Sequence, residues 1–182
     1  METIIFVHSA GPQEGREGSG PLIDYLKKEC INSHSVIHPT MPTPMDPFYA
    51  EWKEEIRRTL DLMEGEVTLI GHSLGGSVLL KYLAEERVNI PINKLISIAT
   101  PYWGINGEWQ RKDFILTPNF SENLSKIPKI IFFHSKLDPI VPLEHMHRFT
   151  EHIHQAIVHE LEGDAHLFTD GLPELVEVLR EV

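Results

Sequence analysis

Residues 66–76 read EVTLIGHSLGG, and the rest of the chain can be interpreted outward from this stretch. Its first half is apolar and β-branched, as strands are, and residues 77–86, SVLLKYLAEE, continue as a helix. Ser73 therefore stands in a tight strand-to-helix turn, flanked by Gly71 and Gly75. Such a turn forces the serine into a sparsely allowed backbone conformation, and glycines remove Cβ atoms that would collide with neighbouring backbone. The pattern predicts a nucleophilic hydroxyl beside a helix N-terminus; a flexible Gly/Ser loop is the alternative.

The composition is that of an ordinary globular chain. With 182 residues, 41% of them hydrophobic, we expect one domain spanning residues 1–182. The net charge of −11 argues against nucleic acid and anionic membrane surfaces as partners. Cys30 is the only cysteine, no basic region precedes the first apolar residues, and no apolar run approaches the ~20 residues of a membrane helix. We therefore expect a cytoplasmic location.

Strand and helix patterns alternate along the chain, which predicts an α/β fold. Besides the strand that leads into Ser73, strands are expected at residues 3–8, 35–38, 94–99, 129–135 and 156–161. Helices are expected to start at Pro21 and Pro142 and to span residues 51–64, 77–86 and 172–180. We predict a three-layer α/β/α domain with a six-stranded, mostly parallel sheet in the order 2-1-3-4-5-6. Its ligand site should lie where the order reverses, between the first and third strands.

Residues 100–128 form the longest irregular segment, and we expect them to act as a short cover over the site. The segment is rich in aromatic residues, namely Tyr102, Trp103, Trp109, Phe114 and Phe120. A cover of this kind would supply an apolar wall for a substrate. The alternative is that these rings simply pack the segment against the body of the protein.

A serine hydroxyl needs a base to act as a nucleophile, and the base needs an orienting acid. Asp138 follows the expected strand at 129–135, and His166 follows the one at 156–161. Because the carboxyl ends of parallel strands share one edge of a sheet, both side chains should lie near Ser73. The order serine, aspartate, histidine is that of α/β-hydrolases. Asp138 could instead be a turn or helix-cap residue, and Asp164 is a rival for the acid.

Together these features resemble the α/β-hydrolase superfamily, and more narrowly the small serine hydrolases typified by retinoblastoma-binding protein 9 and its bacterial relatives. The resemblance covers nearly the whole chain. It rests on HSAG at 8–11, MPTP at 41–44 followed by Trp52, GHSLGG at 71–76, LDPIVP at 137–142 and GDAH at 163–166. It implies that Ser73 is the nucleophile, His166 the base and Asp138 the acid.

The resemblance also implies an oxyanion hole that includes the backbone N–H of Leu74. Relatives often carry glycine directly after the histidine of the first strand, where this chain has Ser9. The second oxyanion donor could therefore be the N–H of Ser9 or that of Ala10. We further expect His8, His72 and Trp103 to bind the substrate, with His72 lining or supporting the pocket.

Two other kinds of site fit the sequence less well. The glycines at 11, 15, 18 and 20 match neither the dinucleotide-binding nor the P-loop pattern, and Glu14 and Glu17 would repel a phosphate. The eleven histidines invite a metal site, but no metal-binding spacing is present, and we expect those at 145, 147, 152 and 154 to be solvated. No metal and no cofactor are therefore expected.

The sequence thus predicts a serine hydrolase that cleaves a small or medium carboxylic ester through an acyl-enzyme intermediate, with a small-molecule ester as its partner. The first alternative is the same three residues acting on an amide, a thioester or a peptide bond, or as a lyase. The second is a catalytically weak hydrolase-fold protein that serves as a protein-binding module. Covalent labelling of Ser73 by a fluorophosphonate would distinguish an enzyme from a binding module.

Overall fold

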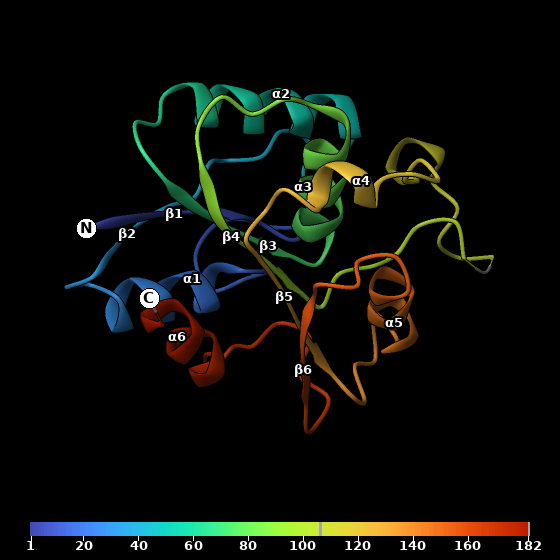
Figure 1. Cartoon of the computed structure of the whole chain (residues 1–182). Coiled ribbons are helices and arrows are strands. Elements are labelled where there is room, and N and C mark those ends of the chain that lie inside the picture. The colour runs from blue at the N-terminus through green and yellow to red at the C-terminus, as the bar shows by residue number, and fades with distance from the viewer. Residues whose placement is uncertain (106, 182) are drawn as a thin grey trace.

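The fold is a layered α/β arrangement built on one sheet (Figure 1). The computed structural model describes residues 1–105 and 107–181. Over these residues six strands pair in the order β2-β1-β3-β4-β5-β6, which confirms the predicted order. All five neighbouring pairs are parallel. The strands are β1 (Glu2–Val7), β2 (His34–Ile37), β3 (Val67–His72), β4 (Ile92–Ile98), β5 (Lys129–Ser135) and β6 (Ile157–Leu161).

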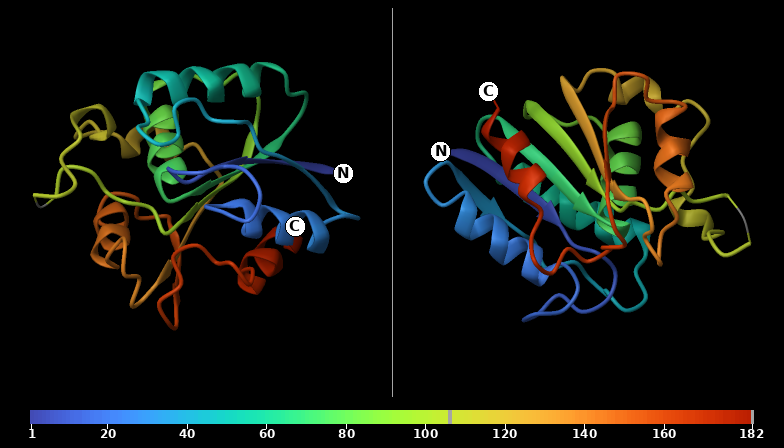
Figure 2. Two further views of the ribbon diagram at one scale, coloured as in Figure 1. Left: turned by 180° about the vertical axis from the view of Figure 1, so that it is seen from behind. Right: turned by 90° about the horizontal axis from the view of Figure 1, so that it is seen from below.

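Helices cover both faces of the sheet, as the two views in Figure 2 show. Successive strand residues point to opposite faces, so Ile5 joins one hydrophobic cluster and Ile4 the other. The first cluster lies under α2 (Tyr49–Asp61), α3 (Leu74–Glu85) and α5 (Glu144–Thr150). The second lies under α1 (Gly20–Glu29) and α6 (Pro173–Arg180). The predicted three layers are therefore confirmed.

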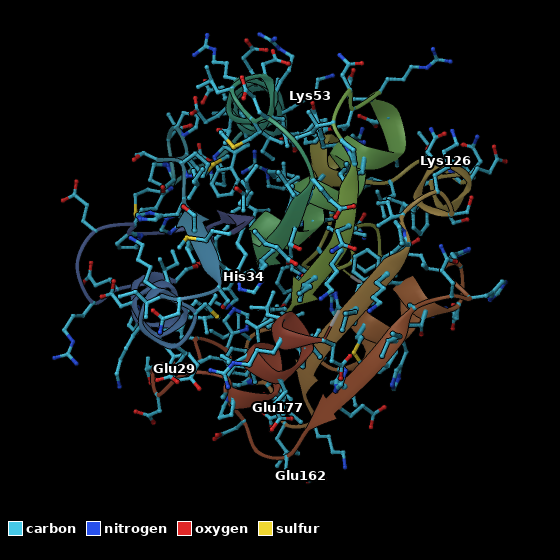
Figure 3. The ribbon with its side chains drawn as sticks, turned by 60° about the vertical axis from the view of Figure 1, so that its left-hand side comes forward. Glu29, His34, Lys53, Lys126, Glu162 and Glu177 are labelled. Atoms are coloured by element: carbon cyan, nitrogen blue, oxygen red, sulfur yellow. The ribbon has the colours of Figure 1, made fainter. Side chains whose placement is uncertain are left out.

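The position of β3 inside the sheet explains why its sequence is apolar without alternation. Every residue of β3 is buried, because helices pack on both of its faces. At the edge of the sheet, β6 is more open, and Ile157 and Val158 are exposed. Acidic side chains such as Glu162 and Glu177 project from the surface of this half of the molecule (Figure 3).

Several observed bounds differ from the predicted ones by up to three residues; α2, for example, spans Tyr49–Asp61 and α5 starts at Glu144. Two differences concern the site. Helix α3 starts at Leu74, directly after Ser73, whereas the sequence pattern placed its start at Ser77. Gly75 and Gly76 are poor helix formers, but the sharp turn at the end of β3 leaves the chain no room for a connecting loop. The segment 100–128 contains a short 3-10 helix, η1 (Lys112–Phe114), and the short helix α4 (Ser121–Leu124).

Within residues 1–105 and 107–181, no helix has the length and apolar character that crossing a bilayer requires.

Candidate active site

Ser73 occupies a strained turn at the carboxyl end of β3. Its φ of 52° and ψ of −119° lie in a region that residues with a Cβ rarely adopt. A Cβ on Gly71 would stand 2.5 Å from the Cα of Gly76, and one on Gly75 would collide with the carbonyl oxygen of Val7. The turn therefore requires glycine at both positions, as the sequence predicted. The N–H of Ser73 donates to the carbonyl of Ile98 at 2.8 Å, which fixes the turn against β4.

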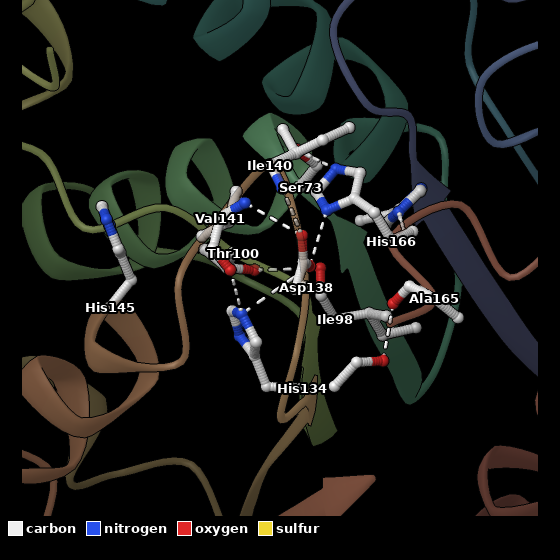
Figure 4. A network of polar contacts seen from close by, with 12 residues as sticks. Ser73, Ile98, Thr100, His134, Asp138, Ile140, Val141, His145, Ala165 and His166 are labelled. Carbon is white, nitrogen blue, oxygen red and sulfur yellow. Dashed lines mark hydrogen bonds and ion pairs between the residues drawn. The ribbon is translucent and has the colours of Figure 1, made fainter. Parts of the chain in front are cut away.

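The structure brings Ser73, His166 and Asp138 into a line of hydrogen bonds (Figure 4). His166 Nδ1 lies 2.8 Å from Asp138 Oδ2, and His166 Nε2 lies 3.2 Å from Ser73 Oγ. When Nδ1 donates to the carboxylate, Nε2 of the neutral ring is left to accept the serine proton. These three side chains come from the ends of β3, β5 and β6, which meet at one edge of the sheet.

Asp138 is held by its own loop as well as by His166. Its Oδ1 accepts hydrogen bonds from the N–H groups of Ile140 and Val141, both at 2.9 Å. Burial raises the pKa of Asp138, but the hydrogen bonds from His166, Val141 and Ile140 outweigh burial and hold the pKa below its usual value. The carboxylate is thus both a turn residue and the partner of His166. The rival acid, Asp164, is exposed.

A histidine that sequence reasoning missed supports this loop. His134, near the end of β5, donates from Nε2 to the carbonyl of Val141 at 2.7 Å and lies 3.7 Å from Asp138 Oδ2. Burial lowers the pKa of His134 and favours its neutral form. Nothing in the local pattern marks a histidine inside an apolar strand as a support for a loop that follows it.

A cavity of about 360 Å³ opens in front of Ser73. Ser9, Ala10, Leu74 and His166 line it beside Ser73. Its apolar wall consists of Trp103, Trp109, Phe114, Ile140, Leu167 and Pro47. A larger hollow of about 640 Å³ lies at the far end of α3, against Asn123, Lys126 and Ile127, and touches none of these residues. The smaller cavity is the relevant one, because only it reaches the serine hydroxyl.

The aromatic segment both lines this cavity and packs on the body of the protein. The ring of Trp103 lies 5.2 Å from that of Trp109 and 5.1 Å from that of Phe114, measured between centroids. Trp103 Nε1 donates to Ser77 Oγ at 3.1 Å, and Lys81 Nζ donates to the carbonyl of Ile115 at 2.6 Å. Because both partners belong to α3, the helix that follows Ser73 also holds the wall of the cavity.

Trp103, Ser9 and Ala10 lie at the cavity, whereas His8 and His72 do not line it. His8 is buried, and its Nε2 lies 3.5 Å from Nδ1 of His38. Burial, followed by the nearby His38 and Lys27, lowers the pKa of His8 to about 4. His72 is fully buried behind the serine, so contact of either side chain with substrate does not match this structure.

The expectation that four histidines near α5 are solvated is confirmed for three of them and wrong for the fourth. His147, His152 and His154 are exposed, but His145 is buried. Its Nδ1 accepts the N–H of Tyr102 at 2.9 Å, so the ring fastens α5 to the aromatic segment. In the part of the chain that the structure describes, no three His, Cys, Asp or Glu side chains gather as a metal site.

The comparisons with known proteins agree with this arrangement. A search of curated proteins found no match to the sequence. The structure resembles that of the ydeN gene product from B. subtilis over 98% of this chain and 97% of that one, with 19% identity and a TM-score of 0.83. It resembles the 2-hydroxy-6-oxo-6-phenylhexa-2,4-dienoate hydrolase from Rhodococcus sp. strain RHA1 over 99% and 91%, with 14% identity and a TM-score of 0.74.

Est1E from Butyrivibrio proteoclasticus is also similar, over 98% of this chain and 85% of that one, with 16% identity and a TM-score of 0.70. At these identities the likeness shows the fold, which is that of the α/β-hydrolases. The narrower resemblance to retinoblastoma-binding protein 9 stays a prediction. Residues 18–178 match the family model described as serine hydrolase, and this range includes Ser73, Asp138 and His166. The chain therefore belongs to the serine hydrolase family and is an enzyme of that class.

Proposed function

We propose that the protein is an esterase that cleaves small or medium carboxylic esters through an acyl-enzyme. The observation that carries the proposal is the line of hydrogen bonds from Asp138 through His166 to Ser73, at 2.8 and 3.2 Å. This line of hydrogen bonds ends at Ser73, which lines the cavity of about 360 Å³. A serine, a base and an orienting acid in this geometry are the parts that acyl transfer needs.

The reaction has two steps. His166 Nε2 takes the proton of Ser73 as Oγ attacks the ester carbonyl, and the same proton then goes to the leaving alcohol. Water, activated by His166, hydrolyses the acyl-serine and restores the hydroxyl. Asp138 stays ionised throughout and stabilises the charged imidazole, a role that suits its lowered pKa.

The oxyanion formed in both steps needs two N–H donors, and the structure favours one of the two candidates after β1. The N–H of Ser9 already donates to Ser19 Oγ at 2.9 Å. Among the described residues, the N–H groups of Ala10 and Leu74 have no hydrogen-bond partner, and both residues line the cavity. We assign the oxyanion hole to Leu74 and Ala10; each such donor is typically worth about 10²–10³ in rate.

The walls of the cavity support an uncharged acyl group. Among the described residues that line it, Arg111 is the one lysine or arginine, and its guanidinium is paired with Asp46 at 3.1 Å and Asp113 at 3.3 Å. The guanidinium also lies over the ring of Phe114, 5.0 Å from its centroid. With this charge compensated, the remaining surface is mostly aromatic and aliphatic, which favours apolar acyl chains short enough for about 360 Å³.

The test is turnover of a series of nitrophenyl esters of increasing acyl length, combined with fluorophosphonate labelling. Ser73→Ala should lower kcat by about 10⁶ and abolish the label. Ser125→Ala, an exposed serine on the surface, is the matched control and should behave as wild type. Near-normal turnover in Ser73→Ala would contradict the proposal. Labelling of Ser73 without turnover of any ester would contradict the ester assignment and favour an amide or thioester substrate.

A further inference from the structure

We propose that His72 is a positioning residue that, together with Ser19, ties the oxyanion loop to the loop that carries the base. The inference rests on the proposed function, because it concerns how Ser73, His166 and Ala10 are held in register. His72 is the last residue of β3 and immediately precedes the nucleophile, yet its side chain is fully buried and does not line the cavity.

His72 makes one hydrogen bond on each side of its ring. Its Nε2 lies 2.8 Å from the carbonyl oxygen of His166, and its Nδ1 lies 2.8 Å from Ser19 Oγ. The two partners belong to different loops, one after β6 and one after β1. The ring of His72 therefore links segments that are adjacent in space but far apart along the chain.

The protons on this link can be assigned. A carbonyl oxygen can only accept, so Nε2 of His72 carries the proton in the bond to His166. Burial, followed by the nearby ring of His166, lowers the pKa of His72 to about 3, so the ring is neutral and Nδ1 bears no proton. Nδ1 is thus an acceptor, and the hydroxyl of Ser19 donates to it. Because that hydroxyl has only one proton, the Ser9 hydroxyl is the donor in its 3.2 Å contact with Ser19 Oγ. The residue is locked in one tautomer by both of its neighbours.

Ser19 extends the link to the residues that shape the oxyanion hole. It is the N-cap of α1 and is fully buried, and its Oγ accepts the N–H of Ser9 at 2.9 Å. This bond uses up the N–H of Ser9 and leaves that of Ala10, the next residue, to face the cavity. The glycines of the loop make the approach possible, since Gly18 has a φ of +52° and a Cβ on it would meet the carbonyl of Pro12.

On the other side, the link holds the main chain of the base. Asp138 fixes the imidazole of His166, but a ring is positioned only if its backbone is also fixed. The carbonyl of His166 is held by His72, and that of Ala165 accepts from Ser135 Oγ at 2.6 Å. His166 is thus held at its ring and at its main chain, which keeps Nε2 at 3.2 Å from Ser73 Oγ.

Two conservative variants of His72 separate the halves of the link. Asparagine places an acceptor near the position of Nδ1, so His72→Asn keeps the bond from Ser19 and loses the one to His166. Glutamine places a donor near the position of Nε2, so His72→Gln keeps the bond to His166 and loses the one from Ser19. Each variant should lower kcat on a nitrophenyl ester about 10- to 100-fold with KM changed less than about twofold, because misplacement affects the transition state more than ground-state binding.

Adding Ser19→Ala to each variant tests which of them still has the hydrogen bond between Ser19 and residue 72. In His72→Gln the Ser19 bond is already lost, so the double variant should have about the same kcat as the worse of the two single variants. In His72→Asn the Ser19 bond remains, so the two effects on kcat should multiply. Equal multiplication in both backgrounds, or wild-type kcat in folded His72→Asn and His72→Gln, would overturn the proposal.

A second measurement holds even if a variant does not fold. Long-range ¹H–¹⁵N NMR of the wild-type protein should show His72 protonated at Nε2 alone, and still neutral at about pH 5, where an ordinary histidine is charged. A proton on Nδ1 or a charged ring would overturn the proposal. This measurement needs no substrate, so it separates the two proposals. Absence of Ser73-dependent turnover in the wild type would refute the esterase function. The tautomer and charge of His72 test its positioning role independently of that function.

Discussion

Asp138 contacts His166 through one carboxylate oxygen and its own loop through the other. Oδ2 lies 2.8 Å from His166 Nδ1, while Oδ1 accepts the N–H groups of Ile140 and Val141. Both oxygens must therefore be acceptors. This requirement distinguishes a carboxylate from an amide of the same shape and leads to the first prediction.

Asp138→Asn should fold but lose most of its activity. The amide oxygen of the new side chain will accept the two N–H groups of the loop, so its NH₂ will face His166 Nδ1 and favour the tautomer with its proton on Nε2. That tautomer cannot accept the proton of Ser73, and kcat should fall by about 10⁴. Steady-state kinetics measure the loss. Asp138→Ala, which also frees the two N–H groups, should in addition lower Tm; an active Asp138→Asn would contradict the assigned role.

Gly75→Ala should destabilise the protein although it adds only a methyl group. The new Cβ would collide with the carbonyl oxygen of Val7, at the point where the turn packs on β1. Overpacking of this kind typically costs about 1–3 kcal/mol, which for a domain of this size corresponds to a decrease in Tm of about 2–12 °C. Gly107→Ala is the control, because a Cβ there meets nothing within 4 Å. Calorimetry of the two variants should differ clearly, and equal Tm values would show that the turn has more room than described.

Stability should fall on mild acidification. Burial lowers the pKa of His72 to about 3 and that of His8 to about 4. Both values lie below that of an unfolded histidine, about 6.5. At pH values between the folded and the unfolded pKa, the unfolded chain binds more protons than the folded one. The contribution of each neutral histidine to the free energy of unfolding is therefore fully present above about pH 6.5 and is lost progressively below it.

Urea unfolding between about pH 7 and 5 measures this loss. Each buried histidine contributes up to about 1.4 kcal/mol per pH unit. His72→Gln should reduce the slope of the free energy of unfolding against pH. His154→Gln, a change at an exposed histidine, should leave that slope as in wild type. A free energy of unfolding that stays constant over this range would contradict the prediction.

Trp103 should set the length of acyl chain that the enzyme accepts. The indole lines the cavity and is held by Ser77 and by the rings of Trp109 and Phe114. Trp103→Ala should move the optimum of kcat/KM toward longer acyl chains, since one methylene in an apolar pocket is worth about 1–3 kcal/mol. Trp103→Phe retains a ring and should move it less. An unchanged optimum in Trp103→Ala would show that the acyl group lies elsewhere.

The sheet and the convergence of the three polar side chains could be predicted because both follow from alternation. Strand and helix patterns fix a parallel sheet, and parallel strands end at one edge, so Ser73, Asp138 and His166 had to be close together. These predictions depend on short-range patterns and general topology, which a single sequence carries. Alternation alone does not fix the order of the strands, because several orders fit the same pattern.

The supporting contacts could not be predicted in this way. His72 and Ser19 touch only because the loop after β1 folds back on the end of β3, and no pattern relates a serine in a glycine-rich loop to a histidine so distant in sequence. The same holds for His134, whose neighbours Asp138 and Val141 are visible in the sequence but whose inward direction is not. Side-chain direction at the end of a buried strand depends on packing, which the sequence pattern does not specify.

The positive φ of Ser73 has an evolutionary consequence. A residue with a Cβ in such a conformation is disfavoured by about 1–3 kcal/mol, and glycine adopts it freely. Ser73→Gly should therefore yield a protein that is inactive and more resistant to heat. A chain selected for stability alone would favour glycine here, so the proposed nucleophilic role of Ser73 would account for a residue that lowers the stability of the fold.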